Sequence, residues 1–224
     1  MGSSAMALWR HIITRGVMAL MLAACLSATA SANVVLIVGD SISAAYGMDT
    51  DQGWVAKLQR QLDDDCQGVS VINASVSGET TAGGRSRLPG LLQRHAPQVV
   101  VIELGGNDGL RGLPPANMAA NLRAMIDMSK QADAQPVLLG MRIPPNYGER
   151  YTAMFEQQFH DVAADTALPF FPFFLDGVVE AGQLQADGIH PTASAQPRLL
   201  NNAWSVLAPV VEPLCDTPAD GGNR

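Results

Sequence analysis

The sequence predicts an α/β domain built around a parallel β-sheet, and two observations support this prediction. Five apolar runs occur in the chain, at residues 34–38, 69–72, 99–104, 136–141 and, more weakly, 170–175. Each run is nearly continuous rather than alternating, as expected for strands that are buried on both faces. Helical patterns separate the runs, and this alternation favours parallel strands joined by right-handed crossovers.

The helices are predicted from the spacing of apolar residues between these runs. The first follows a possible N-cap at Asp51 and contains Trp54, Val55, Leu58 and Leu62. The second is expected to begin near Ser86, with Pro89 in its first turn, where proline is tolerated. Further helices are expected over residues 116–131, 150–164 and 193–207.

The first 32 residues have the pattern of a secretory signal peptide. A basic stretch with Arg10 and Arg15 precedes an apolar run at 17–26 and small residues at 27–32. The run is too short for a comfortable membrane span, so we expect cleavage before Asn33 and a periplasmic or secreted protein. An alternative is a lipoprotein anchored through Cys25, because the tetrapeptide that ends there resembles a lipoprotein box.

Without residues 1–32 the chain keeps 192 of its 224 residues, enough for one core. No internal repeat or interdomain linker appears, so we expect one domain over residues 33–214 and a flexible tail over 215–224. The removed segment holds two basic and no acidic residues, and the net charge therefore falls from −7 to −9. Such a charge argues against nucleic-acid partners and against docking on anionic lipid. We expect a monomer, since nothing indicates an obligate interface.

Two cysteines remain in the expected domain and tail, Cys66 and Cys215. An exported pair can form a disulfide, which here would join the end of the first helix to the C-terminal tail. The alternative is two unpaired thiols. Neither cysteine has a histidine nearby in sequence, which argues against a cysteine nucleophile or a zinc site.

Four short blocks contain residue types that carry chemistry. They are Gly-Asp-Ser-Ile-Ser at 39–43, Asn-Ala-Ser-Val-Ser-Gly-Glu-Thr at 73–80, Gly-Gly-Asn-Asp at 105–108 and Asp-Gly-Ile-His-Pro at 187–191. The first three follow the first three predicted strands. In open parallel sheets, ligands bind beyond the carboxyl ends of the strands, and the blocks are therefore expected to share one site.

Ser41 is the candidate nucleophile, and His190 is its candidate base. Of the three histidines after residue 32, only His190 has a carboxylate at short spacing, Asp187, with Gly188 between them to permit a tight turn. Asp187 can then bond one ring nitrogen and leave the other for Ser41. Each residue also has a plain structural alternative, a helix cap for Ser41 and a turn for the Asp187–His190 pair.

Acyl transfer also needs hydrogen-bond donors for the negatively charged oxygen that develops on the substrate. The N–H groups of Ser41 and Gly78 and the side-chain amide of Asn107 are the candidates. Gly78 and Asn107 are also common turn residues, which is the structural alternative. The acidic residues beside the blocks are interpreted as structural: Asp40, Glu103 and Asp108.

The arrangement lacks Gly-x-Ser-x-Gly, the nucleophile elbow of the α/β-hydrolases. The four blocks instead resemble those of the SGNH (GDSL) hydrolase family in content and order. Longer segments resemble the bacterial TesA-type branch of exported thioesterase I, lysophospholipase L1 and arylesterase enzymes: residues 39–47, 103–112, 144–148 and 185–191. The resemblance covers essentially residues 33–210. It implies a three-layer α/β/α flavodoxin-like fold with a five-stranded sheet, and neither metal nor cofactor.

The resemblance also assigns roles within the site. It implies Ser41 as nucleophile, His190 as base, Asp187 as the group that orients it, and an oxyanion hole made by Ser41, Gly78 and Asn107. It further implies that loops after Asn107 and around 144–147 form the acyl pocket, with the wall residues Leu110, Leu113, Ile143, Pro144 and Tyr147. The cysteine pair is not associated with the family and is a departure from it.

The expected function is hydrolysis of carboxylic esters and thioesters through an acyl-enzyme on Ser41. The resemblance implies small-molecule substrates: aryl and alkyl esters, acyl thioesters and lysophospholipids. A carbohydrate O-deacetylase on the same scaffold is an alternative, but the apolar residues expected around the pocket favour an acyl chain over a sugar. A noncatalytic lipid- or glycan-binding module is a second alternative, which the complete set of catalytic residue types disfavours.

Overall fold

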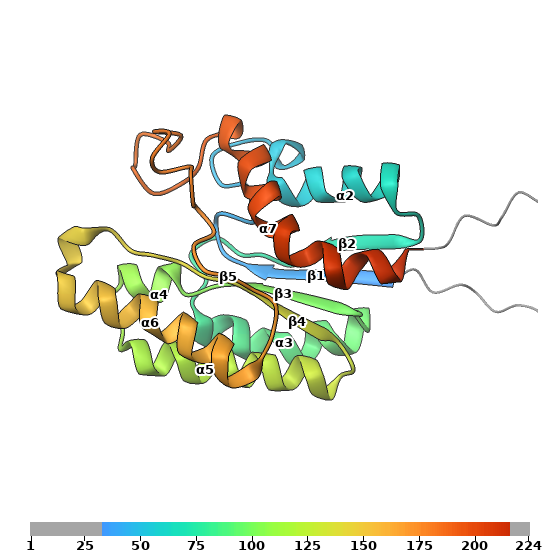
Figure 1. Cartoon of the computed structure of the whole chain (residues 1–224), viewed down its shortest axis with the longest axis horizontal. Helices are drawn as coiled ribbons and strands as arrows, with labels where there is room; N and C mark the ends of the chain where they lie inside the picture. The colour runs from blue at the N-terminus through green and yellow to red at the C-terminus, as the bar shows by residue number, and fades with distance from the viewer. Residues whose placement is uncertain (1–32, 216–224) are drawn as a thin grey trace, which may run out of the picture. The chain divides into compact units, whose positions relative to one another are not determined.

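A parallel five-stranded sheet forms the centre of the computed structural model, which describes residues 33–215 (Figure 1). The strands are β1 (Asn33–Gly39), β2 (Val69–Asn73), β3 (Val99–Glu103), β4 (Gln135–Leu139) and β5 (Phe170–Phe171). Their order across the sheet is β2-β1-β3-β4-β5, and every neighbouring pair is parallel. This is the flavodoxin-like order, and the predicted fold class is confirmed.

Helices cover both faces of the sheet and complete the three layers (Figure 1). One face carries α2 (Trp54–Asp65) and α7 (Gln196–Val211), and the other carries α3 (Thr81–His95), α5 (Pro115–Gln131) and α6 (Glu149–Thr166). Short helical segments lie in the connections: η1 (Thr50–Gln52), α4 (Gly106–Leu110), η2 (Pro145–Tyr147), η3 (Ala193–Ala195) and η4 (Glu212–Leu214).

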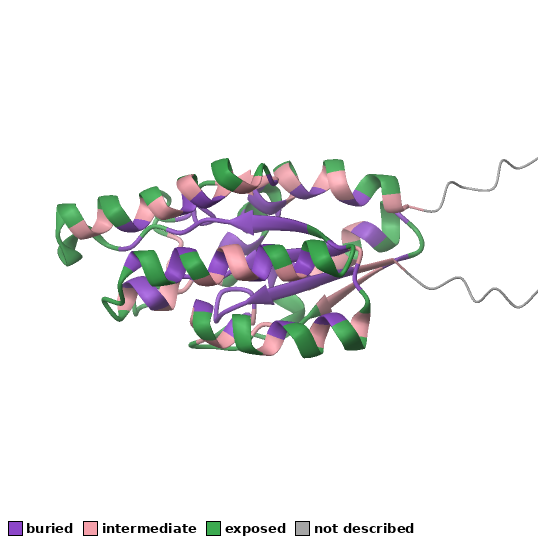
Figure 2. Ribbon diagram, turned by 90° about the horizontal axis from the view of Figure 1, so that it is seen from below, coloured by how far each residue is buried: buried purple, intermediate pink, exposed green. Residues whose placement is uncertain are grey.

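The core lies between the helices and the sheet. The central strands β1 and β3 are buried almost throughout (Figure 2), which explains why their sequences are continuous apolar runs. The helices bury only the stripe that faces the sheet, for example Trp54 and Leu58 in α2 and Phe155 and Phe159 in α6. Full burial of one such side chain stabilises the fold by about 1.5–3 kcal/mol.

The start of α3 differs from the prediction. The helix begins at Thr81, not near Ser86, and Pro89 therefore lies inside it rather than in its first turn. The Thr80 hydroxyl accepts a hydrogen bond from Gly83 N–H, and Asp108 accepts from both the N–H and the hydroxyl of Thr81. These contacts hold the first turn, and they agree with the structural interpretation of Asp108.

Two further boundaries were predicted wrongly, for two physical reasons. Asp51 lies in η1 and does not cap α2, because the N–H of Trp54 donates to Gln196 Oε1 at 2.9 Å. The cap therefore comes from α7, far away in the sequence. The fifth strand is limited to Phe170–Phe171 because the residue that follows, Pro172, has no N–H with which to continue the ladder.

The two ends of the described chain are joined at the amino end of β1. Cys66, at the end of α2, forms a disulfide with Cys215, and Asn33 Nδ2 donates to the carbonyl of Leu214 at 2.7 Å. Cys66 is buried. The expected tail is therefore attached at its first residue.

Several expectations fall on residues outside the described range. The signal peptide and the alternative anchor at Cys25 lie in residues 1–32, and the rest of the tail lies in residues 216–224. Within residues 33–215, no helix is both long enough and apolar enough to cross a membrane.

Candidate active site

The site lies at the carboxyl end of the sheet, in the turn that follows β1. The strand register pairs Gly39 with Glu103, so the ends of β1 and β3 lie side by side. A Cβ at position 39 would lie 2.7 Å from Glu103 Oε2, and glycine is therefore needed for the turn to pack this closely. Ser41 follows and is buried.

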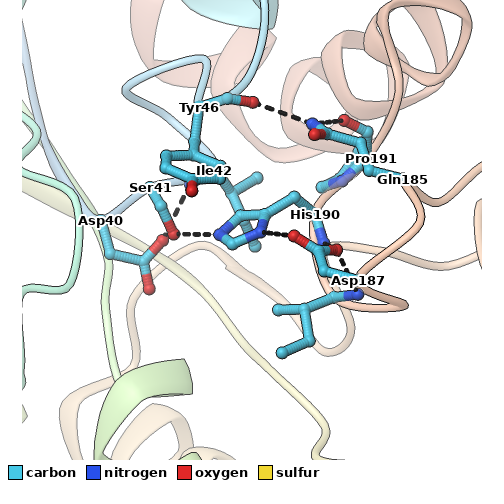
Figure 3. Close-up of polar contacts among 9 residues, drawn as sticks. Asp40, Ser41, Ile42, Tyr46, Gln185, Asp187, His190 and Pro191 are labelled. Atoms are coloured by element: carbon cyan, nitrogen blue, oxygen red, sulfur yellow. Dashed lines mark hydrogen bonds and ion pairs between the residues drawn. The ribbon is translucent and has the colours of Figure 1, made fainter.

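Ser41, His190 and Asp187 form one hydrogen-bonded chain (Figure 3). Ser41 Oγ lies 2.9 Å from His190 Nε2, and His190 Nδ1 lies 2.6 Å from Asp187 Oδ2. The serine and the histidine are 149 residues apart, so the fold rather than local sequence brings them together. This is the geometry in which serine hydrolases hold a nucleophile, a base and an orienting carboxylate.

Asp187 is held by N–H groups of its own turn. Its Oδ1 accepts from Ile189 N–H at 2.9 Å and from His190 N–H at 3.0 Å, and Gly188 has a φ of +69° that permits the turn. The hydrogen bond from the His190 side chain, followed by these two, lowers the pKa of Asp187 to about 2. The carboxylate is therefore charged at neutral pH and can stabilise an imidazolium on His190.

Gly78 and Asn107 lie in the loops on either side of the Ser41 turn, because β2 and β3 flank β1 in the sheet. Arg111 connects the two loops. Its guanidinium donates to the Gly78 carbonyl at 2.8 Å, and its N–H donates to the Asn107 carbonyl at 3.2 Å. Among the residues that the structure describes, the N–H groups of Ser41 and Gly78 have no hydrogen-bond acceptor, so both are free to bind an oxyanion.

Two buried carboxyl groups support the turn. Asp40 accepts from Ile42 N–H and from Asn107 Nδ2, both at 3.0 Å, and burial raises the pKa of Asp40 to about 6. Glu103 accepts from the Ser43 hydroxyl at 2.6 Å, and burial raises its pKa well above the ordinary value. These contacts agree with the interpretation of both acids as structural. The Asn107 amide has a second hydrogen that this bond to Asp40 does not use.

A mostly apolar cavity of about 430 Å³ opens beside Ser41 and His190. Leu110, Ile143 and Pro144 line it, as the sequence interpretation expects. The remaining apolar walls were not identified from the sequence: Ile42, Met141, Pro145, Phe173, Leu175, Val179, Leu184 and Ile189. A cavity of this size and lining accommodates an apolar group bound to the reacting carbonyl.

Two residues expected in the pocket do not line this cavity. The contact recorded for Leu113 is made by its main-chain carbonyl, which accepts a hydrogen bond from the Tyr151 hydroxyl at 2.8 Å. The Tyr147 hydroxyl donates to the Leu110 carbonyl at 2.9 Å, so Tyr147 supports the loop that carries a wall residue. For these two residues, membership of a neighbouring loop was taken for orientation toward the cavity.

The other histidines of the described chain lie elsewhere. His160, on α6, packs edge-on against Phe170, and His95 is the last residue of α3. Residues 33–215 contain no group of three His, Cys, Asp or Glu side chains arranged to hold a metal ion.

Comparison with known proteins gives a consistent family assignment. The model of the GDSL-like Lipase/Acylhydrolase family matches residues 37–196. The chain is 50% identical to Esterase TesA of Pseudomonas aeruginosa over 203 residues, 90% of this chain and 100% of that protein. It is 42% identical to Thioesterase 1/protease 1/lysophospholipase L1 of Escherichia coli K12, over 81% of this chain and 86% of that protein.

A solved structure shows the same similarity in three dimensions. The crystal structure of the psychrotrophic esterase EstA from Pseudoalteromonas sp., inhibited by monoethylphosphonate, has 40% identity and a TM-score of 0.75. The match covers 79% of this chain and 97% of that one. The fold, the family match and the two relatives agree, and the chain belongs to the GDSL-like lipase/acylhydrolase family.

Proposed function

We propose that the protein is a serine esterase that hydrolyses carboxylic esters and thioesters through an acyl-enzyme on Ser41. The observation that carries the proposal is the hydrogen-bonded chain from Ser41 through His190 to Asp187, placed at the mouth of an apolar cavity. The names of the relatives, esterase and thioesterase/lysophospholipase, support the same reaction class.

In the acylation step, Ser41 Oγ attacks the carbonyl carbon while His190 Nε2 takes the hydroxyl proton. Asp187 keeps Nδ1 protonated and stabilises the imidazolium that forms. The tetrahedral intermediate then collapses, and His190 gives its proton to the leaving alcohol or thiol. In the second half of the cycle, water replaces serine as the nucleophile, and the acyl group leaves as a carboxylic acid.

The oxyanion of each tetrahedral intermediate would be bound by the N–H groups of Ser41 and Gly78 and by the Asn107 amide. Each such donor is worth about 10²–10³ in rate in hydrolases of this type. The free N–H groups support this assignment, and so does Arg111, which bonds both loops that carry the flanking donors.

The walls of the cavity favour an acyl chain as the group on the carbonyl side. Most of the lining side chains are aliphatic or aromatic, and few polar groups are available to hydrogen-bond a sugar. The deacetylase is therefore not favoured, and the hydrogen-bonded chain of Ser41, His190 and Asp187 argues against the noncatalytic module. Aryl esters, acyl thioesters and lysophospholipids are the proposed substrate classes, for a monomeric enzyme exported by its first 32 residues.

Replacement of the nucleophile tests the proposal. Ser41→Ala should reduce hydrolysis of a p-nitrophenyl ester by at least about 10⁴-fold, because the acyl-enzyme can no longer form. It should also abolish labelling by a fluorophosphonate probe. Ser194→Ala, a change at an exposed serine bonded to Thr192, is the matched control and should keep both activities. Undiminished hydrolysis by Ser41→Ala would refute the assignment.

A further inference from the structure

Ser41 and His190 come from two segments that need to be held in register. One is the turn after β1, residues 40–47, here called the serine turn. The other is the loop of residues 183–191, here called the histidine loop. The histidine loop is closed by a single isolated β-bridge, and most of its residues around the catalytic positions are exposed. Its internal bonds alone do not set the distance between the two catalytic side chains.

Gln185 joins the two segments through its side-chain amide (Figure 3). Its Nε2 donates to the Tyr46 carbonyl at 2.8 Å, in the serine turn, and to the Pro191 carbonyl at 3.0 Å, in the histidine loop. Its main-chain N–H donates to the His190 carbonyl at 2.7 Å. A Cβ at Gly47, which has a φ of +76°, would lie 2.3 Å from Gln185 Oε1, so the amide packs directly against the turn.

Tyr46 contacts both catalytic residues and Gln185. Its N–H donates to the Ser41 carbonyl at 3.0 Å, and its ring packs against the His190 imidazole with centroids 4.4 Å apart and planes inclined by 35°. Tyr46 is 50% exposed and does not line the acyl cavity. Among the described residues the Tyr46 hydroxyl has no hydrogen-bond partner, so the ring makes the contact with the base.

We propose that Tyr46 and Gln185 are positioning residues that hold the His190 imidazole in register with Ser41. The inference rests on the proposed function and extends it to two side chains that the triad does not include. Gln185 sets the separation of the two segments, and the Tyr46 ring fixes the orientation of the imidazole from one face.

The contact also has an electrostatic consequence. An aromatic face within about 6 Å of a cation stabilises it, and in the proposed cycle His190 becomes an imidazolium when it takes the proton of serine or water. A misplacement of about 1 Å at a reacting group can cost about 10²-fold in rate. Loss of either side chain should therefore lower kcat, while KM for a p-nitrophenyl ester changes little, since neither residue lines the acyl cavity.

Substitutions at Tyr46 separate the ring from the hydroxyl. Tyr46→Leu should lower kcat about tenfold or more, with KM within about twofold of the wild-type value. Tyr46→Phe keeps the ring and should restore most of kcat. Equal losses in both variants, or a loss confined to KM, would overturn the role of the ring.

Substitutions at Gln185 test the amide. Gln185→Met keeps the length of the side chain without its donors and should also lower kcat about tenfold, with the rate of fluorophosphonate labelling falling in parallel. Gln183→Ala is the matched control, because Gln183 lies in the same loop and bonds Thr192 through its main-chain carbonyl. An unchanged kcat in Gln185→Met would overturn the role of the amide.

The double variant tests whether the two side chains hold the same alignment of His190 with Ser41. If they do, Tyr46→Leu/Gln185→Met should lose much less than the product of the two single losses. Independent, multiplicative losses would overturn the shared role. Thermal unfolding confirms that each variant is folded, and Tyr46→Met replaces Tyr46→Leu if that variant does not fold. If the wild type is active and loses activity in Ser41→Ala, but the Tyr46 and Gln185 variants keep full activity, this inference alone is refuted. The proposed function then stands.

Discussion

The two halves of the proposed catalytic site are supported in different ways. The serine turn is part of the core: Asp40, Ser41 and Ser43 are buried, and Glu103 on the neighbouring strand bonds the turn from below. The histidine loop lies at the surface, where the Asp187 side chain is 38% exposed. Asp187 bonds N–H groups of its own turn, whereas the serine turn bonds the sheet.

This difference separates stability from catalysis. Residues beneath the serine contribute buried hydrogen bonds and packing, so changes there should destabilise the fold. Asp187 and His190 are not part of the hydrophobic core, so changes at these two residues of the histidine loop should act mainly on the rate. The following three experiments, in order of expected effect, either sharpen this contrast or remove it.

The largest effect is expected on the exposed side, at the base. His190→Ala should lower kcat by about 10⁴-fold or more, because the serine loses its proton acceptor. The free energy of unfolding in urea should stay within about 1 kcal/mol of the wild-type value, since the side chain contributes little to the core. His160→Ala, on α6, is the control for loss of a histidine outside the site and should retain activity. A large loss of stability in His190→Ala would contradict the contrast.

A smaller effect, on stability rather than on rate, is expected at Glu103, which bonds the serine turn. Glu103→Ala should lower the free energy of unfolding by about 3 kcal/mol, because it leaves a cavity and removes the acceptor of the Ser43 hydroxyl. Glu103→Gln keeps the volume and a neutral acceptor and should cost about 1 kcal/mol. Urea unfolding of both variants measures the difference. Equal stability of Glu103→Ala and wild type would show that the turn does not depend on this group.

The third effect, at most as large as that of Glu103→Ala, is a dependence of stability on pH that originates at Asp40. Its pKa is about 6 in the fold against 3.8 for the free side chain, so between pH 4 and 6 the folded protein binds more protons than the unfolded chain. Stability therefore falls as the pH rises through this window, by up to about 3 kcal/mol for two pKa units. Glu103 acts in the same direction. Asp187, with its pKa lowered to about 2, loses its stabilising effect only below pH 4.

Asp40→Asn isolates this contribution. The difference in unfolding free energy, wild type minus variant, should decrease between pH 4 and pH 6, whatever constant offset the substitution introduces. Urea unfolding across that range measures the difference. A difference that is constant with pH would show that Asp40 does not titrate in this window.

Much of the fold and the triad could be predicted because their signals are local. The buried strands are continuous apolar runs, and Asp187 and His190 lie three residues apart around a glycine. The start of α3 was predicted too late because Pro89 was placed in the first turn, whereas the helix begins at Thr81 and includes Gly84, where a Cβ would lie 2.3 Å from Leu104 Cδ1. Packing of the helix against the strand end therefore requires glycine there.

The walls of the cavity and the positioning pair had no such local signal. Phe173 and Val179 lie between the last strand and the histidine loop, and their direction depends on how that segment crosses the sheet end. Ile42 and Ile189 lie inside two of the four blocks, but the blocks do not show that these side chains face the cavity. Tyr46 and Gln185 act through main-chain carbonyls and a ring face, and no sequence pattern marks these contacts.

The closure of the domain at Cys66 and Cys215 has a consequence for how the enzyme can be attached to a surface. Both ends of the described chain meet where β1 begins, whereas Ser41 follows the other end of that strand. Seven residues of strand span roughly 23 Å. A bead, fusion partner or lipid tether joined at either end would therefore hold the domain by its base, with the mouth of the cavity facing the medium.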